Sequence, residues 1–331
     1  MRIAIYKDTL ANGRGADDAV IALAAGLRER GHDAVLFEKG DFAMRIVERW
    51  DVVVSAGTNE LLDLHGRFRR ASVFPWPVVQ QFHTNPKSQF KWKRFARNWR
   101  IRRALRRVAA IQVLREAFVP QVSKCGAPVE VIGNWSRFGD LAAKSAKSTN
   151  DVIVYPAAFS KGKNQKLLIR AFARVSPGFP GWRLRLLGRT EGRYADECRL
   201  VAGRLGIGGM VDFPGYSRDM AGEYGRCAFV AFPSKDEGFP LTLADAAAFG
   251  RPAVMVHDWI GCAAAGGGVL ARPTVAGYAD GMRRLMADPA LRDRMGESAR
   301  SFCMESYSRG KILDAWERLL NSVAGKGGMQ R

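Results

Sequence analysis

Residues 227–250 read CAFVAFPSKDEGFPLTLADAAAFG. The apolar run over 227–233 is typical of a buried strand in a parallel sheet. A charged turn follows, and from Thr242 the composition favours a helix that ends at Gly250. In an α/β protein such a strand-to-helix loop lies at the carboxyl edge of the sheet, where ligands bind. Because the N–H groups at a helix start favour an anion such as a diphosphate, the stretch predicts an α/β fold with a ligand site at this loop.

Two acidic residues of this stretch are candidates for binding hydroxyl groups. Glu237 lies in the turn just before the helix, and Asp245 lies one to two turns into it. Either carboxylate can accept hydrogen bonds from a sugar or a ribose. Simpler interpretations stay open, because Thr242 and Asp245 fit the T-x-x-D pattern of a helix cap and Glu237 fits an ordinary solvated turn.

A second block upstream has the same order of strand, polar loop and helix. Residues 151–173 read DVIVYPAAFSKGKNQKLLIRAFA, with Lys161 and Lys163 in the loop. A lysine beside a diphosphate stabilises departing negative charge, whereas a loop lysine without such a neighbour is usually only solvated. Strands and helices keep alternating on both sides of the two blocks, which predicts doubly wound parallel sheets.

The two blocks resemble the donor-binding signature of the retaining glycosyltransferases with the GT-B fold, called family 4 or glycosyl transferases group 1. EGFPLTLADA at 237–246 matches their pattern of an acid, seven residues and a second acid, and LLIRAF at 167–172 places Lys163 on their phosphate-binding lysine. The resemblance implies two Rossmann-like domains facing a cleft, with Glu237 and Lys163 at the reacting bond. The further donor-binding residues that it implies are Gly238, Phe239, Pro240, Leu241, Thr242, Asp245 and, in the base pocket, Tyr216.

Two positions depart from the family pattern. The arginine that accompanies the lysine falls on Ala158, and Lys161 or Arg189 are the candidate replacements. The second acid is Asp245, one methylene shorter than the usual glutamate, which weakens its assignment to the ribose. These departures leave open a degenerate member of the family that binds a nucleotide sugar without transferring it.

The N-terminal half carries a less distinct version of the same pattern. Its first strand is followed by a loop with Gly13 and Gly15, only part of a G-x-G-x-x-G dinucleotide fingerprint. In the family this glycine loop brings backbone close to the donor. His83 ends the strand that begins at Val78, where the family carries a histidine that faces the transferred sugar. We assign His83 a catalytic role, although a histidine in a turn is more often structural.

A length of 331 residues corresponds to two domains of ordinary size. We expect an N-terminal acceptor-side domain over 1–145 and a nucleotide-sugar-binding domain over 150–305, separated by a small-residue polar linker. A final helix over 308–322 is expected to pack back on the first domain, as in GT-B proteins. The five cysteines lack metal-ligand spacing and no D-x-D triplet occurs, so we expect reduced thiols, no metal and no cofactor.

The chain is strongly basic, with a formal net charge of +20 and an isoelectric point near 10.3. The excess is concentrated in residues 91–107, KWKRFARNWRIRRALRR. Three interpretations stay open: a helix at an anionic membrane or glycolipid surface, a nucleic-acid surface, or a solvated helix whose aromatic residues face the core. The first is favoured because no nucleic-acid motif accompanies the charge. Its membrane-surface residues are Lys91, Trp92, Lys93, Arg94, Trp99, Arg102, Arg103, Arg106 and Arg107.

The sequence therefore leads to a hypothesis of function and an alternative of another class. The hypothesis is a retaining glycosyltransferase that moves a sugar from a nucleotide-diphosphate donor to a hydroxyl of a glycan or lipid-linked glycan. The charge associates it with bacterial surface polysaccharide, such as lipopolysaccharide core, and with a cytoplasmic location at the inner face of the cell membrane. The alternative is a nucleic-acid-binding protein on an α/β scaffold, although no nucleic acid is expected as a partner.

Overall fold

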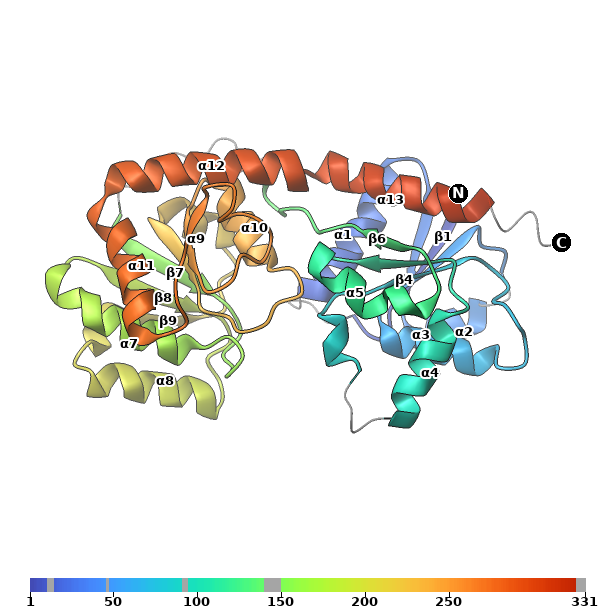
Figure 1. The fold of residues 1–331 in the computed structure, drawn as a ribbon, viewed down its shortest axis with the longest axis horizontal. Coiled ribbons are helices and arrows are strands. Elements are labelled where there is room, and N and C mark those ends of the chain that lie inside the picture. The colour runs from blue at the N-terminus through green and yellow to red at the C-terminus, as the bar shows by residue number, and fades with distance from the viewer. Residues whose placement is uncertain (11–14, 46–47, 91–94, 140–149, 326–331) are drawn as a thin grey trace. The chain divides into compact units, whose positions relative to one another are not determined.

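The computed structural model describes residues 1–10, 15–45, 48–90, 95–139 and 150–325. The chain forms two compact units (Figure 1): unit 1 comprises Met1–Asn134 and Gly310–Arg331, and unit 2 comprises Trp135–Arg309. Each unit contains a six-stranded sheet in which all paired strands are parallel. The expected α/β fold with two doubly wound parallel sheets is confirmed.

The sheet of unit 1 has the strand order β2-β1-β3-β4-β5-β6. Because β1 lies between β2 and β3, the direction of strand addition reverses at β1. The residues of β3, β4 and β5 are all buried, as is usual for a parallel sheet covered by helices. The strands are β1 (Arg2–Tyr6), β2 (Asp33–Phe37), β3 (Val52–Ser55), β4 (Val78–Gln81), β5 (Ala110–Val113) and β6 (Val129–Val131).

The helices of unit 1 include the last helix of the chain, α13, which packs on α1. Gly26 of α1 faces α13, and a Cβ there would lie 2.8 Å from the Leu313 side chain, which would have to shift to make room for it. The Arg30 guanidinium pairs with Asp314 at 2.6 Å and with Glu317 at 2.6 Å. The helices are α1 (Gly15–Glu29), α2 (Lys39–Arg45), α3 (Thr58–Arg67), α4 (Phe95–Leu105), α5 (Val119–Val122) and α13 (Arg309–Ala324).

The sheet of unit 2 has the strand order β12-β11-β10-β7-β8-β9. From β7 the chain adds β8 and β9 on one side, and then β10 on the other. The strands are β7 (Val152–Pro156), β8 (Arg183–Leu187), β9 (Val211–Gly215), β10 (Phe229–Phe232), β11 (Ala253–Met255) and β12 (Gly268–Leu270). The helices are α7 (Gln165–Val175), α8 (Arg193–Arg204), α9 (Met220–Arg226), α10 (Leu241–Ala248), α11 (Val275–Ala287) and α12 (Pro289–Tyr307).

The chain passes from unit 1 to unit 2 between Asn134 and Trp135, ahead of the expected boundary at residue 145. The reason is packing within unit 2. Ser136 and Arg137 donate hydrogen bonds to Asp245, and the Phe138 ring lies 6.2 Å from the Tyr224 ring. Residues 142–149 of the expected linker lie outside the described residues.

Candidate functional site

The candidate site of unit 2 lies where the strand order reverses. β7 and β10 are neighbours in the sheet, and the loops after them lead to helices that continue the chain in opposite directions across the sheet. In open α/β sheets a ligand binds at the carboxyl ends of the strands at such a switch point. The loop after β7 carries Lys163, and the loop after β10 carries Glu237. The two residues that the sequence singles out from separate motifs therefore come from the two loops of one switch point.

Lys163 and Glu237 form an ion pair. The Nζ of Lys163 donates to both carboxylate oxygens of Glu237, at 2.6 and 2.8 Å. The Glu237 side chain is 10% exposed and the Lys163 side chain 31% exposed, so both reach the surface while facing each other. An ion pair in this half-buried position is screened by water less than a pair on the open surface.

The two loops are held together by hydrogen bonds below the ion pair. The backbone N–H of Lys235 donates to the carbonyl of Gly162 at 2.9 Å. The Tyr155 hydroxyl, at the end of β7, donates to the Lys163 carbonyl at 2.9 Å and lies 2.7 Å from the Ser234 hydroxyl. These bonds limit the movement of both backbones, so the positions of Lys163 and Glu237 depend on fixed main-chain geometry.

Helix α10 begins directly after the Glu237 loop. It starts at Leu241 with Pro240 as N-cap, and no side chain among the described residues caps it. Phe239, Pro240 and Leu241 are buried, and the Phe239 ring packs edge-on against Tyr307 at 5.0 Å. These residues can therefore meet a donor mainly through their backbone. The helix-cap interpretation of Thr242 and Asp245 is wrong, because the helix has already begun before Thr242.

Asp245 is completely buried in unit 2. Its Oδ1 accepts from the Ser136 hydroxyl at 3.1 Å and from the Arg137 N–H at 2.9 Å, and its Oδ2 accepts from the Arg137 guanidinium at 2.6 and 3.0 Å. Burial raises the pKa of the Asp245 carboxyl, and the bonds from Arg137 and Ser136 offset part of that effect. The contacts of Asp245 in the structure are thus internal, in contrast to the ribose contact expected from the sequence, because Ser136 and Arg137 bind both carboxylate oxygens inside unit 2.

Three other predicted donor residues lie on the surface of unit 2. Lys161 and Arg189 are exposed, and Tyr216 is 61% exposed. Arg189 follows β8, the neighbour of β7, so it leaves the same edge of the sheet as Lys163. Gly188, just before it, has a φ of +142°, and a Cβ there would lie 2.2 Å from the Ala157 carbonyl oxygen. The loops after β7 and β8 therefore touch, which keeps Arg189 a candidate replacement for the arginine missing at Ala158.

In unit 1, His83 lies just past the end of β4. Neither ring nitrogen has a hydrogen-bond partner among the described residues, and both are buried. Burial, reinforced by the positive charge of Lys7, lowers the pKa of His83 to about 4. The imidazole is therefore neutral at pH 7. Of the two predicted glycines of this unit, Gly15 begins α1 and Gly13 lies outside the described residues.

A second lysine–glutamate pair, not predicted from the sequence, lies at the switch point of unit 1. Lys7 follows β1 and Glu60 lies in the first turn of α3, which follows β3. The Lys7 Nζ lies 2.9 Å from Glu60 Oε1, and Glu60, 2% exposed, also accepts from the Asp8 N–H at 2.9 Å. No motif marks these residues. The signal that could have found them is their position after the two strands between which the sheet order reverses.

Helix α4 contains the described part of the basic segment. Its buried residues are Ile101, Ala104 and Leu105, whereas Phe95 is 81% and Trp99 54% exposed. The interpretation in which the aromatic residues face the core is therefore wrong for Phe95 and Trp99. Three of the predicted arginines are also exposed: Arg102, Arg103 and Arg106. Lys91, Trp92, Lys93 and Arg94 lie outside the described residues.

Arg107 does not belong to the exposed basic surface. Its guanidinium lies 2.9 Å from His65 Nδ1, donates to the Phe68 carbonyl at 2.9 Å and lies over the Phe74 ring at 4.3 Å. Burial lowers the pKa of Arg107. The prediction that Arg107 is a membrane-surface residue is therefore wrong. Its side chain is part of the packing of unit 1.

No helix in the described ranges is long and apolar enough to cross a membrane. No group of three or more His, Cys, Asp and Glu side chains in these ranges is arranged to hold a metal ion. The five cysteines are buried, unpaired thiols.

The fold is GT-B, and solved glycosyltransferase structures share it. Anabaena Alr3699/HepE in complex with UDP and glucose superimposes with a TM-score of 0.79 at 18% identity, covering 97% of this chain and all (100%) of that one. The lipopolysaccharide outer core galactosyltransferase WaaB gives a TM-score of 0.70 at 14% identity, covering 97% and 99% of the two chains. At sequence identities of 18% and 14%, the structural similarity shows that the fold is shared and nothing more.

Residues 139–302 match the family model of Glycosyl transferases group 1. Exopolysaccharide phosphotransferase SCO2592 of Streptomyces coelicolor is 33% identical over 184 residues, 54% of this chain and 19% of that protein. The lipopolysaccharide core biosynthesis glycosyltransferase LpsE of Rhizobium meliloti is 27% identical over 203 residues, 59% of this chain and 58% of that protein. The matches thus span between 19% and 58% of the length of these curated relatives.

Proposed function

We propose that the chain is a retaining glycosyltransferase that transfers a sugar from a nucleotide-diphosphate donor bound to unit 2. The observation that carries the proposal is the Lys163–Glu237 pair at the switch point, in front of the uncapped start of α10. A cation beside a helix N-terminus suits a diphosphate, and a carboxylate beside them suits the hydroxyls of the attached sugar. The match of residues 139–302 to the family model of Glycosyl transferases group 1 supports this proposal.

In the proposed reaction each residue of the pair has one task. Lys163 stabilises the negative charge that develops on the departing diphosphate, and the N–H groups at the start of α10 add to this. Glu237 accepts hydrogen bonds from the sugar and holds its anomeric carbon next to the acceptor. The acceptor oxygen forms its bond on the face from which the diphosphate leaves, and a diphosphate oxygen takes the acceptor proton, so that configuration is retained. No metal is required in this scheme.

The acceptor in our proposal is a hydroxyl of a glycan or lipid-linked glycan in bacterial surface polysaccharide synthesis. The names of the relatives LpsE and WaaB support this class. In unit 1 we assign His83, which is neutral because of its lowered pKa, to hydrogen bonding with the transferred sugar. We further propose that the enzyme works in the cytoplasm on the inner face of the membrane, held there by the exposed residues of α4.

Donor binding is expected to depend on Lys163 and not on Lys161. We would screen UDP-, GDP- and ADP-sugars by thermal unfolding, since a ligand at 100 times its Kd adds about 2.7 kcal/mol to the free energy of unfolding. For the donor that stabilises the wild type, Lys163→Ala should raise Kd about tenfold or more, because a charge-assisted bond is lost. Lys161→Ala, which removes an exposed lysine of the same loop, should change Kd by less than about threefold. Equal effects of the two substitutions would place the diphosphate elsewhere.

Attachment to the membrane is expected to depend on Arg102, Arg103 and Arg106. Wild-type protein should sediment with phosphatidylglycerol-containing vesicles at low salt and be released as salt rises, because the Debye length falls from about 10 Å at 0.1 M to about 3 Å at 1 M. Each basic residue near an anionic surface contributes about 1 kcal/mol, so replacing all three with glutamine should weaken binding about 100-fold.

A matched control for this experiment removes the same charge from unit 2. Arg204, Arg284 and Arg294 are exposed arginines outside α4, and their replacement with glutamine lowers the net charge equally. We expect this triple variant to bind vesicles nearly as well as the wild type. If both triple variants lose the same affinity, the attraction is a property of the net charge, and the role of α4 is refuted.

A further inference from the structure

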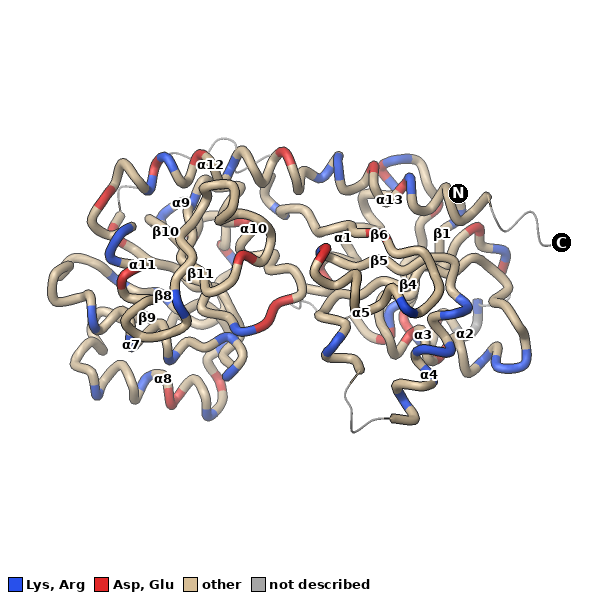
Figure 2. The backbone as a smooth tube through the Cα atoms, viewed as in Figure 1, with Lys and Arg blue, Asp and Glu red and all other residues tan. Residues whose placement is uncertain are grey.

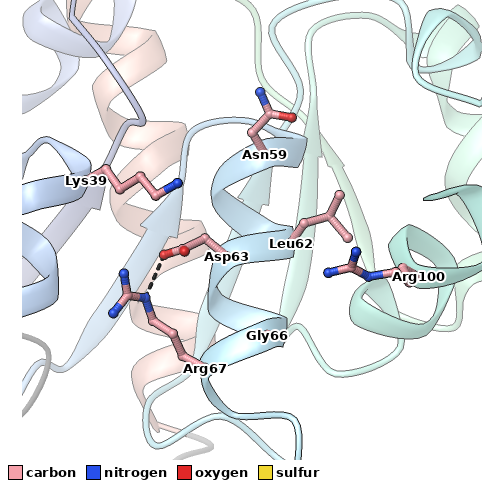
Figure 3. Close-up of a pocket in the computed structure, with 7 residues that line it drawn as sticks. All are labelled: Lys39, Asn59, Leu62, Asp63, Gly66, Arg67 and Arg100. Atoms are coloured by element: carbon pink, nitrogen blue, oxygen red, sulfur yellow. Dashed lines mark hydrogen bonds and ion pairs between the residues drawn. The ribbon is translucent and has the colours of Figure 1, made fainter.

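An open pocket of about 460 Å³ lies on the exposed side of α3 in unit 1 (Figure 3). Its lining comes from three helices, α2, α3 and α4, all within unit 1. In the close-up, Lys39 and Arg100 point toward α3 from opposite sides, and Arg67 extends along it. The lining residues are Lys39, Asn59, Leu62, Asp63, Gly66, Arg67 and Arg100.

The charges around this pocket do not balance. Its one carboxylate, Asp63, is already engaged, because Asp63 Oδ2 accepts from the Tyr6 hydroxyl at 2.9 Å and from Arg67 Nε at 2.7 Å. The side chains of Lys39 and Arg100 are exposed and have no acidic partner among the described residues. Lys39 and Arg100 therefore leave two positive charges at the rim of a hollow that also offers the Asn59 amide as a donor.

The pocket is continuous with the exposed surface of α4. Arg100 belongs to this helix and follows Trp99 directly. Phe95 and Trp99 lie four residues apart, on one face of the helix, and Arg102, Arg103 and Arg106 continue this face at intervals of three or four residues. In Figure 2 the Lys and Arg positions along the backbone of α4 are coloured blue. A basic pocket beside exposed aromatic residues is the arrangement expected of a surface that meets lipid head groups.

We propose that this pocket binds the phosphate head group of an anionic lipid. The guanidinium of Arg100 can bind phosphate oxygens through two parallel N–H bonds, and the ammonium of Lys39 adds a charge from the other side of α3. Phe95 and Trp99 then contact the interfacial region of the bilayer next to the bound head group. The proposal rests on the membrane part of the proposed function and adds to it a specific head-group site, distinct from the diffuse attraction of Arg102, Arg103 and Arg106.

The test compares two double variants of equal charge. Lys39→Gln with Arg100→Gln removes the pocket cations, and Lys124→Gln with Arg318→Gln removes one exposed lysine and one exposed arginine elsewhere in unit 1. Binding is measured to phosphatidylglycerol-containing vesicles, to neutral phosphatidylcholine vesicles, and to monomeric dihexanoyl phosphatidylglycerol by calorimetry. Inorganic phosphate and pyrophosphate form a separate arm. Thermal unfolding checks that both variants fold.

The pocket variant should lose about tenfold or more of its affinity for the anionic vesicles and for the short-chain lipid, and the control less than about threefold. Equal losses in the two variants, or no loss in either, would overturn the proposal. So would binding of inorganic phosphate in the pocket without any effect of the pocket substitutions on lipid binding, since the site would then serve a soluble phosphate. A wild type that binds no vesicles refutes the membrane part of the proposed function as well, whereas a pocket variant that binds anionic vesicles as tightly as the control variant refutes this inference alone.

Discussion

A Glu237→Gln variant is expected to fold normally and to transfer sugar about 100- to 1,000-fold more slowly than the wild type, as for the loss of a group that stabilises a transition state. Glutamine keeps the shape of the side chain but loses the charge. It therefore accepts weaker hydrogen bonds from the sugar and leaves the Lys163 ammonium without the counter-charge that lies 2.6 Å away in the wild type. The measurement is the initial rate with the donor that stabilises the wild type.

The control for this variant is Glu297→Gln, which makes the same chemical change at an exposed position of α12. It should leave the rate within about twofold of the wild type, since surface substitutions of this kind change little. Thermal unfolding of both variants separates a loss of chemistry from a loss of fold. A Glu237→Gln enzyme that retains more than a third of the wild-type kcat/KM would show that Glu237 has no part in the reaction.

The second large effect is on stability. Replacing Arg137 with alanine is expected to lower the free energy of unfolding by about 3–5 kcal/mol, because it leaves the buried Asp245 carboxylate without a counter-charge. Asp245 is 0% exposed and receives two of its bonds from the Arg137 guanidinium. Chemical denaturation measures the change. Arg204→Ala, at an exposed position of α8, is the control and should cost less than about 0.5 kcal/mol.

The cost of Arg137→Ala should also depend on pH. Burial raises the pKa of Asp245, so the folded protein binds its proton more readily than the unfolded chain does. The stability linked to such a group is present at low pH and is lost as the pH rises through the folded pKa. Without Arg137 the pKa rises further, so the difference from the wild type should be smaller at about pH 5 than at about pH 8. A pH-independent difference, or one below about 1 kcal/mol, would contradict this account.

Double replacement distinguishes the ion pair from simple loss of packing. Arg137→Met combined with Asp245→Leu removes both charges and keeps apolar volume, which for buried pairs is often neutral or stabilising. We expect this double variant to recover most of the stability lost in Arg137→Ala. If the double variant binds the donor as tightly as the wild type does, the pair acts on α10 only through packing. If it binds the donor more weakly, the charges of the pair contribute to the donor site.

The local order of strand, loop and helix was determined by the sequence alone. The apolar runs at 152–156 and 227–233 contain the strands β7 and β10, and the helix-forming stretches after them are α7 and α10, because periodicity and glycine placement act over short distances. The positions of Lys163 and Glu237 followed from the same local order. Each lies in a loop directly after a strand, so a parallel sheet brings them to one edge.

The long-range contacts were decided only by the tertiary structure. Arg137 lies 108 residues from Asp245 along the chain, and Lys7 lies 53 residues from Glu60. Pairs so distant in sequence have no local signature, because nothing in the neighbouring residues specifies which carboxylate a given cation will meet. The structure also starts α10 at Leu241, one residue before the Thr242 expected from the sequence. Pro240 is the N-cap, so Thr242 already lies inside the helix and does not cap it.

The outward face of α4 was decided in the same way. Aromatic and aliphatic residues are distributed along this basic segment, so its hydrophobic pattern permits either group to face the core. Packing in unit 1 buries Ile101 and Leu105 and leaves Phe95 and Trp99 exposed, while Arg107 is taken into contacts with His65 and Phe74. Residue type and spacing thus determined which elements form and what chemistry they carry. Which side chains meet, and which remain at the surface, depended on packing between elements far apart in the chain.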